Sequence, residues 1–157
     1  MKLTRKKGLP GGHLGPRTSG EDALQQIRFD LDGAIASHAG DPEVWRTELH
    51  TKLRALGLVF TMHARVAEGG NGSLTEILSL RPNHAHAVAI IRREHKSIAA
   101  QIRLLERIAG SRSMPAAGEV EFLRDRAGKL LESIRLHQAR GVDLLFEAFY
   151  RDYGGPG

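Results

Sequence analysis

Cysteine is absent from this chain of 157 residues, and its absence excludes several kinds of chemistry. Without cysteine there can be no disulfide framework, no thiolate metal site and no thiol nucleophile. His, Asp and Glu are therefore the strong metal ligands that remain. A metal site in this protein would be built from nitrogen and oxygen atoms.

Long apolar runs are also missing. No stretch approaches the roughly 20 consecutive apolar residues that a transmembrane helix requires. Nor does the basic start of the chain lead into the run of about seven or more apolar residues that marks a secretory signal. We therefore expect no membrane partner and, by default, a cytoplasmic location.

The excess of positive charge is confined to the first 20 residues. This segment holds five Lys or Arg residues and no acid, which leaves 18 basic and 18 acidic residues in positions 21–157. It is rich in Gly and Pro and has few apolar side chains, so we predict a disordered tail over residues 1–20. Because the excess charge lies on this short arm and not on a folded surface, nucleic-acid binding is disfavoured.

The rest of the sequence has the pattern of helices. No segment shows the alternation of a strand, whereas several place apolar residues three and four positions apart, so that they share one face of a helix. The predicted helices cover about residues 21–38, 42–68, 82–109 and 119–150, with a short helical turn at 74–80. Ser19 is expected to cap the first helix, and Asp41 to cap the second with Pro42 at its first position.

Short connections between these helices favour antiparallel packing of successive helices. We therefore predict an all-α fold, an antiparallel up-down four-helix bundle over residues 21–153, followed by a flexible C-terminus at 154–157.

Four histidines occupy positions on these faces that are otherwise apolar: His38, His63, His95 and His137. A buried imidazole needs a hydrogen-bond partner or a metal, because an unpaired buried polar group costs about 1–3 kcal/mol. In an antiparallel pair, residues equally far from the connecting loop lie at equal height. By this rule three of the histidines fall within about two turns of one another, whereas His38 lies at the opposite end.

The same rule identifies the part of the first helix that lies level with His63. It spans about residues 19–25, where Glu21 and Asp22 are the ionic side chains.

Three stretches resemble the bacterial hemerythrin-like family. The run from His137 to Gly155 has that family's last-helix pattern of a histidine, acidic residues, an apolar pair, an acid-Ala-aromatic run and a terminal Asp-x-Gly-Gly. Arg93-Glu94-His95 looks like the third-helix motif. The segment from His63 to Gly70 looks like the second-helix histidine, acidic cluster and glycine pair. The resemblance covers about 110 residues, from about position 44 to position 155.

The resemblance implies a metal site inside the bundle. Hemerythrin-like domains hold two iron atoms, using histidines from all four helices and bridging carboxylates from the second and fourth. They bind or sense oxygen, handle reactive oxygen species, or store or sense iron. Carried over by position, the metal ligands are His63, His95 and His137, with Glu68 as the candidate carboxylate.

This chain departs from the family's pattern at the bridging carboxylates. Ala67 stands four residues after His63 and Gly141 four residues after His137, while Asp143 is rotated off the apolar face. Three neutral imidazoles and one carboxylate fit one divalent ion with an open position better than a di-iron centre.

Two functional readings follow from these residues. The first is a hemerythrin-like cation-binding protein that holds iron, as one ion or two, and binds or senses oxygen or iron, with a metal ion or small gas molecule as its ligand. The alternative is a metal-free helical bundle that serves as a scaffold or interaction module. No nucleophile-elbow serine or His-Glu-x-x-His motif is present, so we do not predict an enzyme, although metal-dependent oxygen or peroxide chemistry stays open.

Overall fold

The computed structural model describes residues 19–37, 40–112 and 116–150, and every regular element in these ranges is helical. The expected all-α fold with four long helices is therefore confirmed. The elements are α1 (Ser19–Ala36), α2 (Pro42–Glu68), α3 (Ser73–Leu80), a short 3₁₀ turn η1 (Pro82–His84), α4 (Ala85–Ala109) and α5 (Glu119–Phe149).

Some of the sequence predictions concern residues outside these ranges. They are the tail up to residue 18, His38, and the C-terminal residues 151–157 with the flexible end predicted at 154–157.

The start of α2 follows the sequence signals closely. Asp41 has an extended backbone, and its side chain accepts a hydrogen bond of 2.8 Å from the backbone N–H of Glu43. Pro42 takes the first helical position, where the missing N–H costs nothing. The helix then ends at Glu68, before a pair of glycines, as predicted.

Other boundaries differ from the prediction by a few residues. Ser19 was expected to precede the first helix, but it is the first residue of α1, so residues 19 and 20 belong to the bundle and not to the tail. The third long helix was expected to begin at Pro82. Instead, Pro82 opens the η1 turn and α4 begins three residues later. The residue before a proline is disfavoured in the helical conformation, and Arg81 has φ −138° and ψ 73°.

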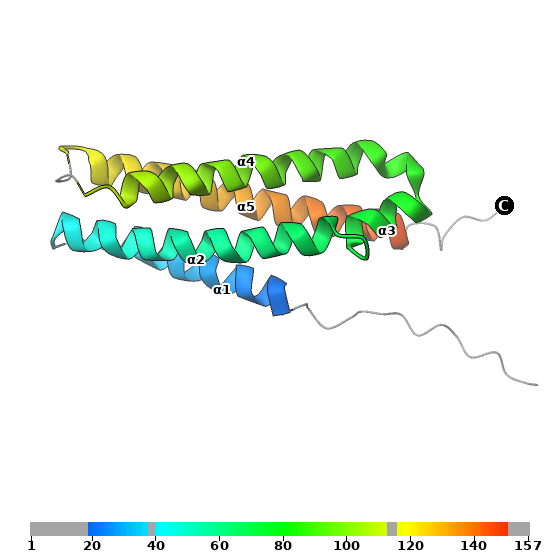
Figure 1. The fold of residues 1–157 in the computed structure, drawn as a ribbon, viewed down its shortest axis with the longest axis horizontal. Coiled ribbons are helices and arrows are strands. Elements are labelled where there is room, and N and C mark those ends of the chain that lie inside the picture. The colour runs from blue at the N-terminus through cyan, green and yellow to red at the C-terminus, as the bar shows by residue number, and fades with distance from the viewer. Residues whose placement is uncertain (1–18, 38–39, 113–115, 151–157) are drawn as a thin grey trace, which may run out of the picture.

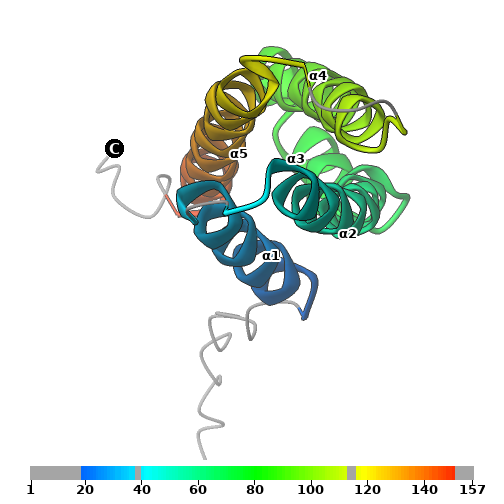
Figure 2. The ribbon, with the colours of Figure 1, turned by 90° about the vertical axis from the view of Figure 1, so that its left-hand side faces the viewer.

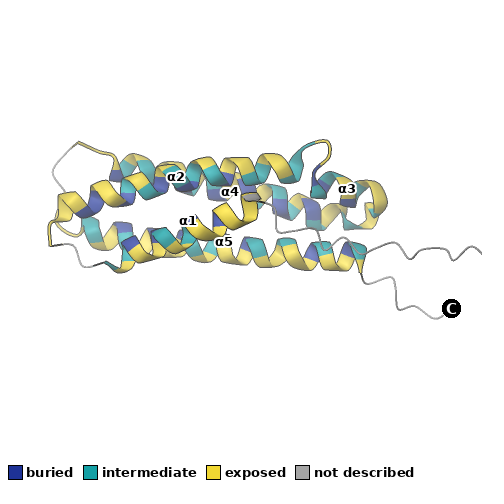
Figure 3. Cartoon of the chain, turned by 90° about the horizontal axis from the view of Figure 1, so that it is seen from below, coloured by how far each residue is buried: buried dark blue, intermediate teal, exposed yellow. Residues whose placement is uncertain are grey.

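The four long helices lie side by side, and successive ones run in opposite directions (Figure 1). Viewed end-on, they follow one another around the bundle in the order α1, α2, α4, α5 (Figure 2), and each packs against its two neighbours in this ring. The view in Figure 3 shows that α1 stops part-way along α2 and α5. One half of the bundle is therefore covered by four helices and the other by fewer.

The buried apolar side chains form two clusters. The closed-half cluster draws on all four long helices and comprises Leu24, Ile27, Leu31, Trp45, Leu49, Leu53, Leu56, Phe60, Ile98, Ile102, Leu105, Ala109, Leu123, Ala127, Leu130 and Ile134. The open-half cluster comes from α3, α4 and α5 and comprises Leu74, Ile77, Val88, Ile91, Leu144 and Ala148.

The position of His95 shows what separates these clusters. On α4, Ile91 of the open-half cluster lies one turn before His95, and Ile98 of the closed-half cluster lies one turn after it. On α5, His137 likewise lies between Ile134 and Leu144. A polar layer therefore interrupts the apolar interior.

Among the described residues, no helix has both the length and the apolar character needed to cross a bilayer.

Candidate metal centre

Three helices each contribute one histidine to the polar layer: His63 from α2, His95 from α4 and His137 from α5. One ring nitrogen from each lies within 4.8 Å of the other two. The ring centroids are 5.4 Å apart for His63 with either partner and 4.7 Å apart for His95 with His137. The structure thus brings together the three histidines that equal height along the bundle places in one layer.

An aromatic ring covers one side of this cluster. Phe60, one turn before His63 on α2, is 1% exposed, and its ring centroid lies 5.7, 6.0 and 5.9 Å from those of His63, His95 and His137. His95 and His137 are themselves buried, and His63 is half-buried. Water is therefore kept from this side of the imidazoles. The three-residue spacing between Phe60 and His63 predicts that both share one face of α2, but it does not predict contact with all three rings.

A cavity of about 250 Å³ adjoins the cluster. The three imidazoles line it, together with Ala67, Gly141 and apolar side chains of α3, α4 and α5, and Glu21 and Gln25 line it from α1. A Cβ atom built on Gly141 would meet nothing within 4 Å, so this space is open. Asp143 is exposed, as its rotation off the apolar face predicted. The small side chains at 67 and 141 thus line open space at the positions where the resemblance implies carboxylates.

Two carboxylates contact the outer nitrogens of the buried rings. His95 Nδ1 lies 2.5 Å from Glu68 Oε1, and His137 Nδ1 lies 3.0 Å from Glu94 Oε2. Glu94 also forms an ion pair with Arg140. In a neutral imidazole whose Nδ1–H donates to a carboxylate, Nε2 keeps its lone pair. These contacts therefore favour the tautomer in which Nε2 can bind a metal.

The structure places Glu68 differently from the histidines with which it was grouped. Its carboxylate lies against the Nδ1 atom of His95 and is not one of the groups that converge within 4.8 Å. From this position it can orient the His95 ring, a role that outer carboxylates commonly have at histidine metal sites. Its assignment as a metal ligand stays a prediction.

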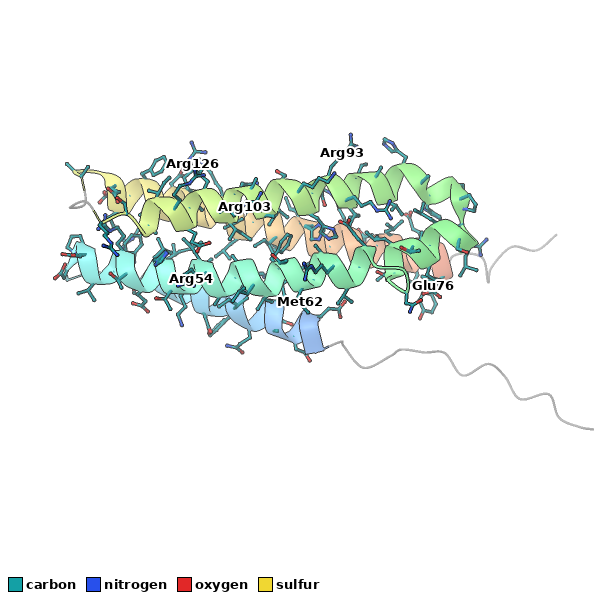
Figure 4. All side chains as sticks on the ribbon, viewed as in Figure 1. Arg54, Met62, Glu76, Arg93, Arg103 and Arg126 are labelled. Carbon is teal, nitrogen blue, oxygen red and sulfur yellow. The ribbon has the colours of Figure 1, made fainter. Side chains whose placement is uncertain are left out.

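Glu94 is a partner that the sequence did not assign to any histidine. Adjacent residues on a helix point about 100° apart, so a position next to His95 predicts that Glu94 faces solvent or a neighbouring helix. It faces α5, whereas Arg93, one position earlier, points away from the bundle (Figure 4). No local pattern indicates which helix Glu94 contacts, because that depends on how α4 is rotated against α5.

The inner nitrogens of the cluster are incompletely satisfied. His63 Nε2 lies 3.2 Å from His137 Nε2, a distance that allows one N–H···N hydrogen bond. His95 Nε2 is buried and has no hydrogen-bond partner. Such an atom costs about 1–3 kcal/mol in a folded protein, and a bound ion is one of the recognised reasons for it. The donor set fits a metal: three imidazole nitrogens converge, and one of them lacks any other partner.

Burial favours the neutral form of His63 and His137. Burial, followed by the neighbouring His137 and His95, lowers the pKa of His63 to about 4. Burial also lowers the pKa of His137, against the opposing effect of its hydrogen bond to Glu94. The neutral imidazole is the form that binds metals. At pH 7 both rings are therefore ready to bind a metal without first losing a proton.

Comparisons of the chain with protein-family models, with curated proteins and with solved structures found no match. The resemblance to hemerythrin-like proteins stays a prediction that depends on the motifs in the sequence.

Proposed function

We propose that this chain binds one divalent transition-metal ion through His63, His95 and His137, in a bundle of the hemerythrin-like kind. Iron is the metal that the resemblance implies. The observation that carries the proposal is the convergence of three imidazole nitrogens, from three different helices, within 4.8 Å.

The surroundings of the histidines support this choice. Imidazole is a good ligand for iron, zinc, copper and nickel. The carboxylates of Glu68 and Glu94 sit on the outer nitrogens, as they do in carboxylate–histidine–metal arrangements. The orphaned Nε2 of His95 would gain in a metal the partner that it lacks.

One ion fits these residues better than two. Two metals in a low-dielectric core need bridging carboxylates to offset their charge. Ala67 and Gly141 line the cavity and supply none, while the two nearby glutamates contact the Nδ1 atoms.

The imidazoles, Phe60 and the cavity have different roles in the proposed site. The three imidazoles would hold the ion, Phe60 covers one side of them, and the cavity adjoins them and could admit a small ligand. When bound, such a metal can act as a Lewis acid or take part in one-electron chemistry with a small ligand. Binding or sensing of oxygen or iron is the role that the resemblance implies for such a site.

The proposal is tested by metal content and by Fe(II) titration of the full chain without oxygen. We expect about one metal per chain in the wild type and none in His95→Leu. His86→Leu, which changes an exposed histidine on the same helix, serves as the matched control and should bind like the wild type. Equal metal content in the wild type and in His95→Leu, or no binding by the wild type, would contradict the proposal.

One observation favours the metal-free alternative, a bundle that serves as a scaffold or interaction module. The contact of 3.2 Å between His63 and His137 can join two of the three rings without any metal. If this reading holds, His95→Leu removes an unpaired buried nitrogen and stabilises the protein by about 1 kcal/mol, with no change in metal content.

A further inference from the structure

The cavity beside the three histidines has a single carboxylate in its lining, that of Glu21 on α1. The other polar groups there, apart from the imidazoles, are the amides of Gln25 and Gln138 and the hydroxyl of Ser73. Gln25 lies one turn after Glu21, so this face of α1 is directed toward the cavity. Asp22, the neighbouring acid, does not line it.

The ionic side chains around the histidines would balance only part of the charge of a divalent ion. Glu68 and Glu94 contribute two negative charges close to the imidazoles, and Arg140 offsets one of them through its ion pair with Glu94. A divalent ion held by three neutral imidazoles would then face a net charge of about −1 from its nearest ionic neighbours. Burying an uncompensated charge is costly, so a second negative charge on the cavity side would strengthen binding.

Glu21 is free to supply that charge. It makes no hydrogen bond or ion pair with any residue in the described ranges, and it is exposed. It lies in the first turn of α1, where the backbone N–H groups have no partner within the helix and the turn frays easily. His95, whose buried Nε2 has no hydrogen-bond partner, lines the same cavity.

The geometry points to Glu21 as the carboxylate ligand that completes the coordination of an ion held by His63, His95 and His137. This inference rests on the proposed function. It adds a fourth helix to the site, because α1 would then contribute a ligand beside α2, α4 and α5. It also gives the net charge that the three imidazoles cannot provide, with a ligand atom that suits iron, cobalt and manganese.

Co(II) alone is the probe for the test, because its visible spectrum responds to the number and kind of its ligands. The wild type, Glu21→Gln and Asp22→Asn are titrated as full chains. The two variants remove the same charge from adjacent residues of the same exposed turn, but only position 21 lines the cavity. We expect Glu21→Gln to weaken Co(II) binding by at least about tenfold and to change the spectrum. Asp22→Asn should stay within about twofold of the wild type and keep its spectrum.

The outcomes separate this inference from the proposed function. Unchanged affinity and spectrum in Glu21→Gln, with Co(II) bound by the wild type and lost in His95→Leu, overturns the role of Glu21 and leaves the three-histidine site standing. Equal weakening in both variants without a spectral change also overturns it, since the effect would then be one of distant charge. Failure of the wild type to bind Co(II) overturns both.

Discussion

The closed half of the bundle and the histidine layer lie on the same faces of α4 and α5 but contain different kinds of side chain. In the closed half, leucines and isoleucines from all four long helices meet in a sixteen-residue cluster. Next to this cluster, the same faces of α4 and α5 carry His95 and His137, and α1 reaches this level only with its first turns. Most of the apolar packing therefore lies in the closed half, whereas the buried, unpartnered Nε2 of His95 lies in the layer beside it.

The largest effect on stability is expected when a side chain is removed from the closed half. Leu53 is fully buried there, so Leu53→Ala is expected to lower the free energy of unfolding by about 2–5 kcal/mol. Metal stoichiometry should not change, because Leu53 lies outside the histidine layer. Denaturant unfolding and metal analysis of the same preparation check both statements. Loss of bound metal in the folded variant would show that the two regions are not separable.

Acid is expected to act on the histidine layer and not on the closed half. His63 takes up a proton near pH 6.5 in the unfolded chain but only near pH 4 in the folded one. Between these values the unfolded state binds more protons, so stability is fully present above about pH 6.5 and falls as the pH drops toward 4. We expect the metal-free protein to be about 2 kcal/mol less stable at pH 5 than at pH 7.

The control for this loss is His63→Leu, measured by denaturant unfolding at both pH values. The variant should lose a clearly smaller amount of stability than the wild type on acidification. An identical loss in both proteins would show that His63 does not carry the effect.

The smallest expected effect on stability comes from replacing two helical glycines, one beside the histidines and one in the closed half. Alanine stabilises a helix interior by about 0.5–1 kcal/mol relative to glycine. At Gly141 a new Cβ meets nothing within 4 Å, so Gly141→Ala should gain this amount in the metal-free protein. At Gly57 it would lie 3.4 Å from Ile102 Cγ2 in the closed half, so Gly57→Ala should gain less. Thermal unfolding of both variants compares the two gains in stability. A larger gain at Gly57 would mean that the packing of the closed half can accommodate an added methyl group.

The helices were predictable because their signals are local. Apolar spacing fixes which residues face inward, and Asp41 with Pro42 fixes the start of α2 within one residue. Errors fall where local signals compete, as at Pro82, where a tight turn precedes the helix. The equal height of His63, His95 and His137 also followed from local information, since loop positions and the helical rise determine it.

The partners of the histidines could not be predicted in the same way. Whether Glu94 reaches His137 depends on the rotation of α4 about its axis, which packing against α5 decides. The contact of Glu68 likewise depends on how α2 and α4 pack against each other. The resemblance grouped Glu68 with the metal ligands, but its carboxylate contacts Nδ1 of His95. Phe60 was recognised as a buried residue, but its contact with three imidazoles depends on three helices at once.

The origin of each histidine on a separate helix has a consequence for how the chain folds. His63 and His95 are 32 positions apart in the sequence, and His95 and His137 are 42 positions apart. No two of them can meet until loops of that length have closed, and the entropy of closure must first be offset by packing elsewhere. The unfolded chain therefore holds no preformed arrangement of these rings that could trap an ion, and metal binding and folding are coupled.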